Sequence, residues 1–133
     1  MRLSRKSEYA LLALVELSRS YHEDNLKIID ISRTCNIPKK YLEQILIQLK
    51  GAGYVRSIRG SSGGYRLAKN PADINLAEII RLIDGALAPV GSASIYFFEH
   101  TPIEYNSKLL NIMKDIRGYA AKLLESTTFQ DLI

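Results

Sequence analysis

The stretch that most constrains this chain runs from residue 38 to residue 67 and reads PKKYLEQILIQLKGAGYVRSIRGSSGGYRL. It predicts a helix, a sharp stop at Gly51 and Gly53, and a hairpin whose tip is almost entirely glycine and serine. Its Lys and Arg residues are opposed by a single acid, Glu43. A helix that starts with polar side chains and leads into a basic hairpin is typical of a DNA-binding winged helix.

The helix in this stretch has apolar residues at positions 42, 45, 46 and 49, a spacing that buries one stripe. Pro38 suits its first turn, because the N–H that proline lacks would have no partner there. A shorter helix is expected from Ile28 to Cys35, ended by Asn36 in the left-handed conformation. Two helices joined by so tight a turn form a helix-turn-helix.

The hairpin after this helix is predicted to have strands at residues 54–58 and 64–67, joined by RGSSGG. Its glycines permit positive φ angles and a close approach to another backbone. We interpret this hairpin as the wing.

Further helices are expected on both sides of this unit. Ser7 is expected to cap the first helix, and Asn75 to cap a fourth helix over residues 76–84 that ends at Gly85. Residues 86–102 are irregular yet apolar, and a loop of that length usually has a function or covers something.

The last helix is expected over residues 104–126, and its apolar residues are spaced 4, 3, 4, 3 and 4 apart, as in a coiled coil. A helix of about twenty residues is roughly 30 Å long and overhangs so small a domain. We therefore favour pairing between two chains over packing on the chain's own first helix. Apolar residues at 129, 132 and 133 are expected to dock back on the body. The predicted dimerisation residues are Tyr105, Leu109, Ile112, Ile116, Tyr119 and Leu123.

These expectations give a mainly α fold: a winged helix-turn-helix with a two-stranded wing, plus a long C-terminal dimerisation helix. Residues 1–85 are predicted to form the DNA-binding domain and residues 86–103 an effector or sensor loop region. Residues 104–133 are predicted to form the dimerisation helix and the C-terminal tail. A chain of 133 residues is long enough for one such domain.

The charge of the chain is unevenly distributed. Residues 1–70 hold 13 Lys and Arg against 6 Asp and Glu, a balance of +7, whereas residues 71–133 hold 5 against 8, a balance of −3. A basic first half indicates a part that binds a polyanion, joined to a part with another task. Chance clustering on a solvated surface is the alternative interpretation.

Other features exclude several classes of protein. A single cysteine, Cys35, excludes an internal disulfide and fits a reducing cytoplasm. The basic and then apolar start resembles a signal peptide, but Glu8 and Glu16 interrupt it. No stretch approaches the roughly 18 apolar residues of a membrane span. We therefore expect a cytoplasmic protein with no membrane partner.

No residues indicate catalysis or a metal site. The sequence shows no plausible Ser–His–acid or Cys–His arrangement, and GSSGG lacks the GK[ST] ending of a phosphate loop. His22 and His100 are isolated, which favours surface residues over metal ligands. The chain is predicted not to be an enzyme.

The residues predicted to contact double-stranded DNA come from the start of the helix and from the hairpin. Glu43 would read cytosine N4 or repel wrong sequences, or else only pair with a neighbouring lysine. Arg59 would enter the minor groove or contact phosphate alone. The full predicted set is Lys39, Lys40, Tyr41, Glu43, Gln44, Arg56, Arg59, Gly60, Ser61, Ser62 and Arg66.

Four stretches together resemble the Rrf-two family of bacterial winged-helix transcriptional regulators: MRLSRKSEYALLAL, IPKKYLEQILIQLKGAGYVRSIRGSSGGYRLAKNP, LAEIIRLIDG and ESTTFQDL. The resemblance covers nearly the whole chain. It implies a homodimer, most often a repressor, joined through the last helix and bound to a palindromic operator. It also implies that Glu43 and Gln44 lie at recognition-helix positions and that Arg59 enters the minor groove.

The resemblance fails at one point. Cluster-binding members of that family carry three cysteines between the fourth and last helices, whereas residues 92–107 contain none. Ser92, Ser94, Thr101 and Ser107 lie in that segment instead, and hydroxyls substitute poorly for the thiolates that hold an iron–sulfur cluster. Glu8 matches a carboxylate ligand of some members, but one carboxylate cannot hold a cluster. We predict no iron–sulfur cluster, whether the cysteines are naturally missing or have been replaced.

Two alternatives concern the signal rather than the DNA. One is a cluster-free regulator that binds a partner enzyme through residues 86–102. The other is a small-molecule or redox sensor that uses this loop as a pocket or Cys35 as an oxidisable thiol. For Cys35, an inert half-buried thiol is the simpler interpretation, because a reactive thiol needs a lowered pKa.

Overall fold

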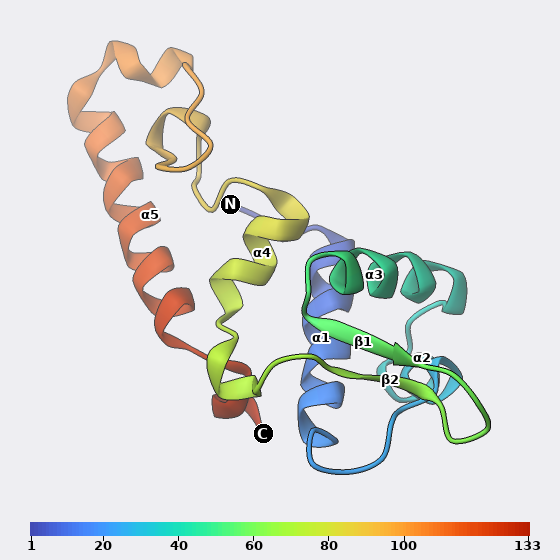
Figure 1. Cartoon of the computed structure of the whole chain (residues 1–133). Helices are drawn as coiled ribbons and strands as arrows, with labels where there is room; N and C mark the ends of the chain where they lie inside the picture. Colours follow the sequence, from blue (N-terminus) through green and yellow to red (C-terminus); the bar gives the residue numbers. More distant parts are fainter.

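A computed structural model describes all of residues 1–133 and has the predicted mainly α architecture, with five α-helices and one two-stranded sheet. α4 lies between α1 and α5, while α2, α3 and the sheet lie on the other side of α1 (Figure 1). Short 3₁₀ turns occupy part of the connections. The elements are α1 (Arg5–Arg19), α2 (Ile28–Cys35), α3 (Lys39–Gly51), β1 (Val55–Ile58), β2 (Gly64–Leu67), α4 (Leu76–Asp84) and α5 (Ser107–Ser126).

The main core is built where α1, α2, α3 and the base of the sheet meet. The predicted stripe of α3 is fully buried there, together with Leu14 and Leu17 of α1 and Ile31 of α2. Burying a side chain of this size contributes about 1.5–3 kcal/mol. The core therefore fixes the side of α3 that faces inward, and leaves its other side to solvent.

The predicted cap of the first helix is wrong. Ser4, not Ser7, is the N-cap: its hydroxyl accepts a hydrogen bond from the Ser7 backbone N–H at 3.0 Å. Ser7 lies inside the helix and is buried. The Ser4 hydroxyl and backbone N–H also donate to the carboxylate of Asp84 at the end of α4. A contact across the fold therefore sets where α1 begins.

The turn between α2 and α3 is close to its prediction. Asn36 has a φ of 54° and ends α2 in the left-handed conformation. Pro38 is the N-cap residue of α3 rather than a member of its first turn, because its ψ of 128° is extended and not helical. The helix-turn-helix is confirmed, with α3 starting one residue later.

The sheet pairs β1 and β2 antiparallel, with Val55 opposite Leu67 and Arg56 opposite Arg66. Leu26, in the connection before α2, forms an antiparallel bridge to the free edge of β2 through two backbone hydrogen bonds with Tyr65 of 2.9 and 2.7 Å. β1 starts at Val55, one residue later than predicted, because Tyr54 still bonds back to the end of α3. The wing is therefore attached to the body along one edge.

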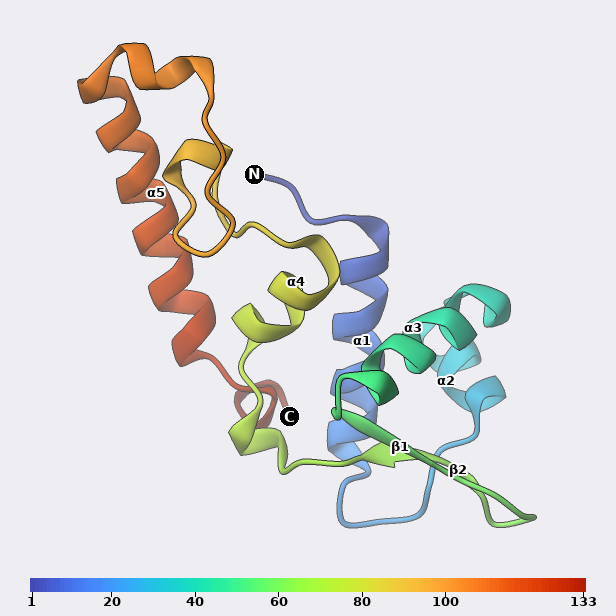
Figure 2. The same cartoon turned by 45° about the horizontal axis from the view of Figure 1, so that its top comes forward.

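The second half of the chain matches its predictions in part. α4 has the predicted bounds, with Asn75 and Glu78 forming a capping box. α5 begins at Ser107 because the side chain of Asn106 caps it; the residues before it form a 3₁₀ turn, so the predicted start at 104 is wrong. None of its residues is fully buried, and α5 extends away from the winged helix (Figure 2).

Of the three apolar side chains at the C-terminal end, only Phe129 docks, and it is fully buried in the main core. Leu132 and Ile133 stay exposed, so the expectation that they dock is wrong: the 3₁₀ turn at 129–132 directs only Phe129 inward. None of the helices combines the length and apolar character that a membrane crossing requires.

Candidate nucleic-acid interface

The start of α3 presents a row of polar side chains. Lys39, Lys40, Glu43 and Gln44 are all exposed on the face opposite the buried stripe. No ion pair joins Glu43 to either lysine, so the structure offers no support for Glu43 as a mere pairing partner. This end of α3 and the tip of the wing lie on the same side of the molecule, away from α5 (Figures 1 and 2).

Two further residues of α3 have surroundings that the sequence did not describe. Tyr41 lies on the flank of the helix, and its ring packs edge-on against Tyr9 of α1 with centroids 5.4 Å apart. Ile47, absent from the predicted set, is 68% exposed on the same face as the polar row. The sequence signal for Ile47 was its apolar side chain at a helix position outside the buried stripe. Such a side chain can pack against the methyl group of thymine.

The wing tip is held in one shape by backbone contacts. A Cβ on Gly63 would lie 2.1 Å from the Ile58 carbonyl oxygen, and a Cβ on Gly64 would lie 2.4 Å from that of Leu26. The Asn25 side chain donates to the Ser62 carbonyl at 3.1 Å. Only glycine fits at 63 and 64, and the resulting turn leaves four exposed residues at the tip: Arg59, Gly60, Ser61 and Ser62.

The two strand arginines of the predicted set lie apart from the tip. Arg56 is exposed, directly opposite Arg66 in the sheet. Arg66 is half-buried, and its Nη2 donates to the Tyr21 carbonyl at 3.1 Å. Arg66 therefore ties the wing to the end of α1, a contact that makes it less available to DNA than the tip residues.

Side-chain contacts join the interface to α4. Gln48 of α3 donates to the Leu82 carbonyl at 3.4 Å, and the Tyr54 hydroxyl donates to Glu78 Oε1 at 2.8 Å. Burial and then this hydrogen bond raise the pKa of Tyr54 to about 12, so the hydroxyl stays a donor at neutral pH. Through these contacts α3 and the base of the wing are both held by α4.

The predicted dimerisation residues form an exposed apolar stripe. Five of them lie along α5 and are between 42% and 77% exposed: Leu109, Ile112, Ile116, Tyr119 and Leu123. Tyr105 is 99% exposed in the turn that precedes α5, so it lies outside the helix that carries the other five. Contiguous exposed apolar surface of this kind is typical of a protein–protein interface.

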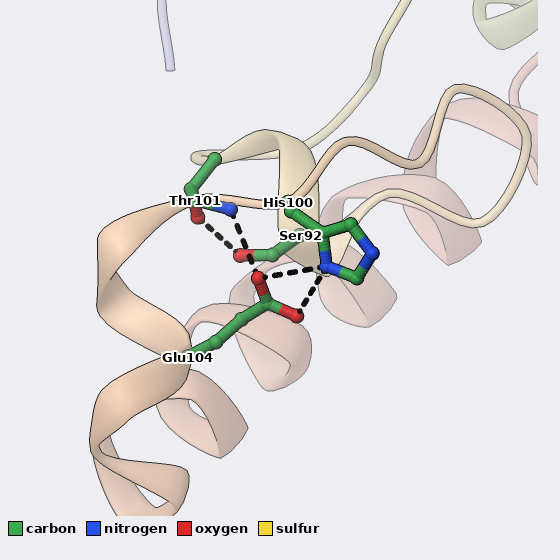
Figure 3. Close-up of polar contacts among 4 residues, drawn as sticks. All are labelled: Ser92, His100, Thr101 and Glu104. Carbon is green, nitrogen blue, oxygen red and sulfur yellow. Dashed lines mark hydrogen bonds and ion pairs between the residues drawn. The ribbon is translucent and has the colours of Figure 1, made fainter.

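Residues 86–103 form a loop with a buried base and an exposed aromatic tip at 95–98. Near its end the Ser92 and Thr101 hydroxyls hydrogen-bond to each other (Figure 3). Glu104 accepts hydrogen bonds from His100 Nδ1 and the Thr101 backbone N–H, and the bond from His100 lowers the pKa of its carboxyl. These groups stabilise the turn into α5 by satisfying one another.

This donor set does not fit an iron–sulfur cluster. The cysteine-free segment offers hydroxyls that are already paired, and the one cysteine lies on α2. No three His, Cys, Asp or Glu side chains come together in a way that would hold a metal ion. Cluster ligands in proteins are predominantly thiolates.

We therefore predict that anaerobic reconstitution with iron and sulfide leaves the protein without a cluster. The ultraviolet–visible spectrum should show no charge-transfer absorbance after desalting, because thiolate ligands are missing. Charge-transfer absorbance at stoichiometric iron would refute the prediction.

The surroundings of Cys35 disfavour a reactive thiol. Its Sγ lies 3.7 Å from the Leu12 carbonyl oxygen, and burial followed by the charge of Glu16 raises the thiol pKa. A raised pKa lowers the fraction of thiolate, which is the form that acts as a nucleophile and reacts with oxidants. The position of Cys35 favours the inert interpretation.

We predict that peroxide leaves DNA binding unchanged. Operator affinity, measured by fluorescence anisotropy before and after treatment at neutral pH, should be equal in the native protein and in Cys35→Ser. A loss of affinity that appears only in the native protein would make Cys35 a redox switch and overturn this prediction.

Comparison with known proteins agrees with this architecture. The family model Rrf2, described as an iron-dependent transcriptional regulator, matches residues 3–133. The HTH-type transcriptional regulator CymR of Bacillus subtilis is 35% identical over 132 residues, which cover 99% of this chain and 89% of CymR.

Solved structures agree as well. The structure titled CymR (YrzC), the global cysteine regulator of B. subtilis, superposes with a TM-score of 0.79 at 32% identity, covering 99% of this chain and 95% of that one. T. potens IscR has a TM-score of 0.74 at 30% identity, covering 99% and 85%. The relatives are DNA-binding transcriptional regulators, a class of protein distinct from enzymes. With its sequence matched almost from end to end and its winged helix intact, the chain belongs to the Rrf2 (Rrf-two) family of helix-turn-helix transcriptional regulators.

Proposed function

We propose that this protein is a homodimeric repressor that binds a palindromic operator. The observation that carries the proposal is that the start of α3, which bears the exposed polar row, and the wing tip lie on one side of the molecule. An α-helix is about as wide as the DNA major groove, so α3 can enter it end-first. Repression requires no more than occupation of a promoter by such a dimer.

Each group has a role in this proposal. Lys39 and Lys40 contact phosphates, since a lysine ammonium is a strong point charge. Glu43 and Gln44 read base edges, with Glu43 accepting from cytosine N4, and Ile47 packs on thymine methyl groups. Arg59 enters the minor groove beside the wing.

The dimer follows from the apolar stripe of α5. A second copy is the occupant that supplies a matching stripe, and isologous pairing places two identical DNA-reading units about a two-fold axis. Two such units read the two halves of a palindrome, with half-sites about 10 base pairs or a multiple of it apart.

Selection of bound sequences from a random DNA pool with the purified protein tests the proposal. The expected product is one two-fold symmetric sequence that binds far more tightly than a scrambled duplex at physiological salt. Equal binding of the scrambled duplex would refute sequence-specific recognition.

Repeating the selection with Glu43→Gln tests the role of the acid. A glutamine cannot accept a hydrogen bond in the same way that a carboxylate does, and its amide also donates, so the preferred base at one position of each half-site should change. The expected change in discrimination is about 1–3 kcal/mol at that position. An unchanged consensus would remove Glu43 from the reading set.

A further inference from the structure

A pocket of about 500 Å³ lies between the end of α4, the loop at 94–97 and the C-terminal half of α5. Its volume is within the range of small-molecule sites, roughly 300–1,000 Å³. Leu87 and the rings of Tyr96 and Phe97 supply apolar walls, while Arg117 and Lys122 of α5 supply charge. The pocket does not include any residue of the DNA-binding face.

The charges that line this pocket are unbalanced in favour of cations. Arg81 is paired with Glu125 at 2.8 Å and its guanidinium lies 4.9 Å from the centre of the Tyr96 ring. Arg117 donates from Nη1 to the Ala93 carbonyl at 3.0 Å, and its Nε has no hydrogen-bond partner. Lys122 has no acidic partner at all. The pocket is therefore suited to an anion.

Gly118 provides a second, independent observation. It lies within α5 and lines the pocket, although glycine is unfavourable inside a helix. A Cβ built on Gly118 would meet no atom within 4 Å, so nothing in the chain requires the glycine. The effect of the missing side chain is to widen the pocket, which suggests that a bound group approaches the helix backbone there.

The pocket also stays open in the proposed dimer. At 3.6 residues per turn, Gly118, Ala121 and Glu125 lie on the opposite face of α5 from the stripe that contains Ile116 and Leu123. Pairing through that stripe leaves the pocket side of α5 uncovered.

The geometry points to a binding site for a small organic monoanion with an aromatic group, of the size of an aryl carboxylate. Its carboxylate is held by Arg117 and Lys122, and its ring packs against Tyr96 and Phe97. Arg81 belongs to α4, which holds α3 through the contact between Gln48 and Leu82. Through this link the bound anion would act as an effector of DNA binding, and that part of the inference rests on the proposed function. The binding of the anion to the pocket does not rest on it.

Titration of the ¹⁵N-labelled full chain with 3-phenylpropionate, without DNA, tests the site by heteronuclear NMR. The amide of Gly118 is expected to shift in a saturable way, while the amides of Gly60 and Gly63 in the wing stay unmoved. The neutral amide 3-phenylpropanamide should bind at least about tenfold more weakly, since it lacks the charge that strengthens the hydrogen bonds. No saturable shift at Gly118, or equal affinity for the neutral analogue, would overturn the inference.

Two variants and a matched control complete the test. Gly118→Ala should raise the melting temperature, because alanine favours the helix, yet weaken binding about fivefold or more by filling the pocket. Lys122→Gln should weaken binding about two- to fivefold. Lys108→Gln, at the exposed far end of α5, should change neither. Unchanged affinity in Gly118→Ala would place the probe elsewhere and overturn the assignment.

The two proposals fail separately. Absence of probe binding leaves operator selection unaffected, because the titration contains no DNA. Failure of operator selection, with intact binding of 3-phenylpropionate, would overturn the DNA-reading proposal and leave the pocket assignment in place.

Discussion

Replacing Ile112 and Ile116 together with glutamate is expected to yield a monomer that has lost about two orders of magnitude or more in operator affinity. Both side chains lie in the exposed stripe of α5. Pairing the stripes would bury two carboxylates from each chain, and an unpaired buried charge costs far more than the apolar contact it replaces. The second half-site then binds as a separate molecule, and the gain from linkage, about 10²–10⁴, disappears.

Analytical ultracentrifugation and fluorescence anisotropy on the selected operator measure the two effects. Because α5 contributes no fully buried residue, the circular dichroism spectrum of the variant should stay that of a folded protein. Lys114→Glu is the matched control: it adds a carboxylate to the face of α5 turned away from the stripe and should remain dimeric. A dimeric Ile112→Glu/Ile116→Glu protein would show that the interface lies elsewhere.

Replacing both Lys39 and Lys40 with alanine is expected to weaken binding to all DNA sequences alike, by about a hundredfold or more near physiological salt. Each lysine occurs twice in the proposed dimer, so the double variant removes four phosphate contacts. The slope of log affinity against log salt should become shallower by about 3.6, which is about 0.9 for each contact. Both side chains are exposed, so stability should change little.

Anisotropy titrations at several salt concentrations give the slope directly. Lys114→Ala removes one lysine charge from each chain far from α3 and should leave the slope unchanged. If the double variant lost affinity only for the selected operator and kept its binding to scrambled DNA, the lysines would read bases, and their assignment to phosphates would be wrong.

The parts of the fold that local chemistry determines were predictable. The bounds of α4 follow from a capping box at its start and a glycine at its end, both within a few residues of the helix. The left-handed Asn36 and the glycines of the wing are equally local signals. The exposed stripe of α5 also followed from its spacing, because a helix shows its faces in the sequence.

The errors lie where distant residues decide. Ser4 caps α1 while it is hydrogen-bonded to Asp84, which lies 80 residues away in sequence. Because the local sequence does not show this contact, Ser7 looked suitable as the cap. The contacts of Tyr41 with Tyr9 and of Arg66 with Tyr21 likewise join residues that are distant in sequence, although the predicted DNA contacts of Tyr41 and Arg66 stay predictions. The pocket beside Gly118 needs three separate segments in register, which no single stretch of sequence describes.

The way in which the end of α5 is attached to the rest of the chain limits how far apart the two halves of the operator can be. Directly after the helix, the Thr127 carbonyl accepts from the Leu76 N–H at 3.0 Å, and the Phe129 N–H donates to the Ile74 carbonyl at 3.1 Å. Residues 127–129 are thus joined to the segment that starts α4, leaving no flexible hinge there. A rotation of α5 would carry α4 with it, and α3 through α4. In the proposed dimer, the separation of the two DNA-reading units is then set by these contacts within each chain and not by the length of a linker.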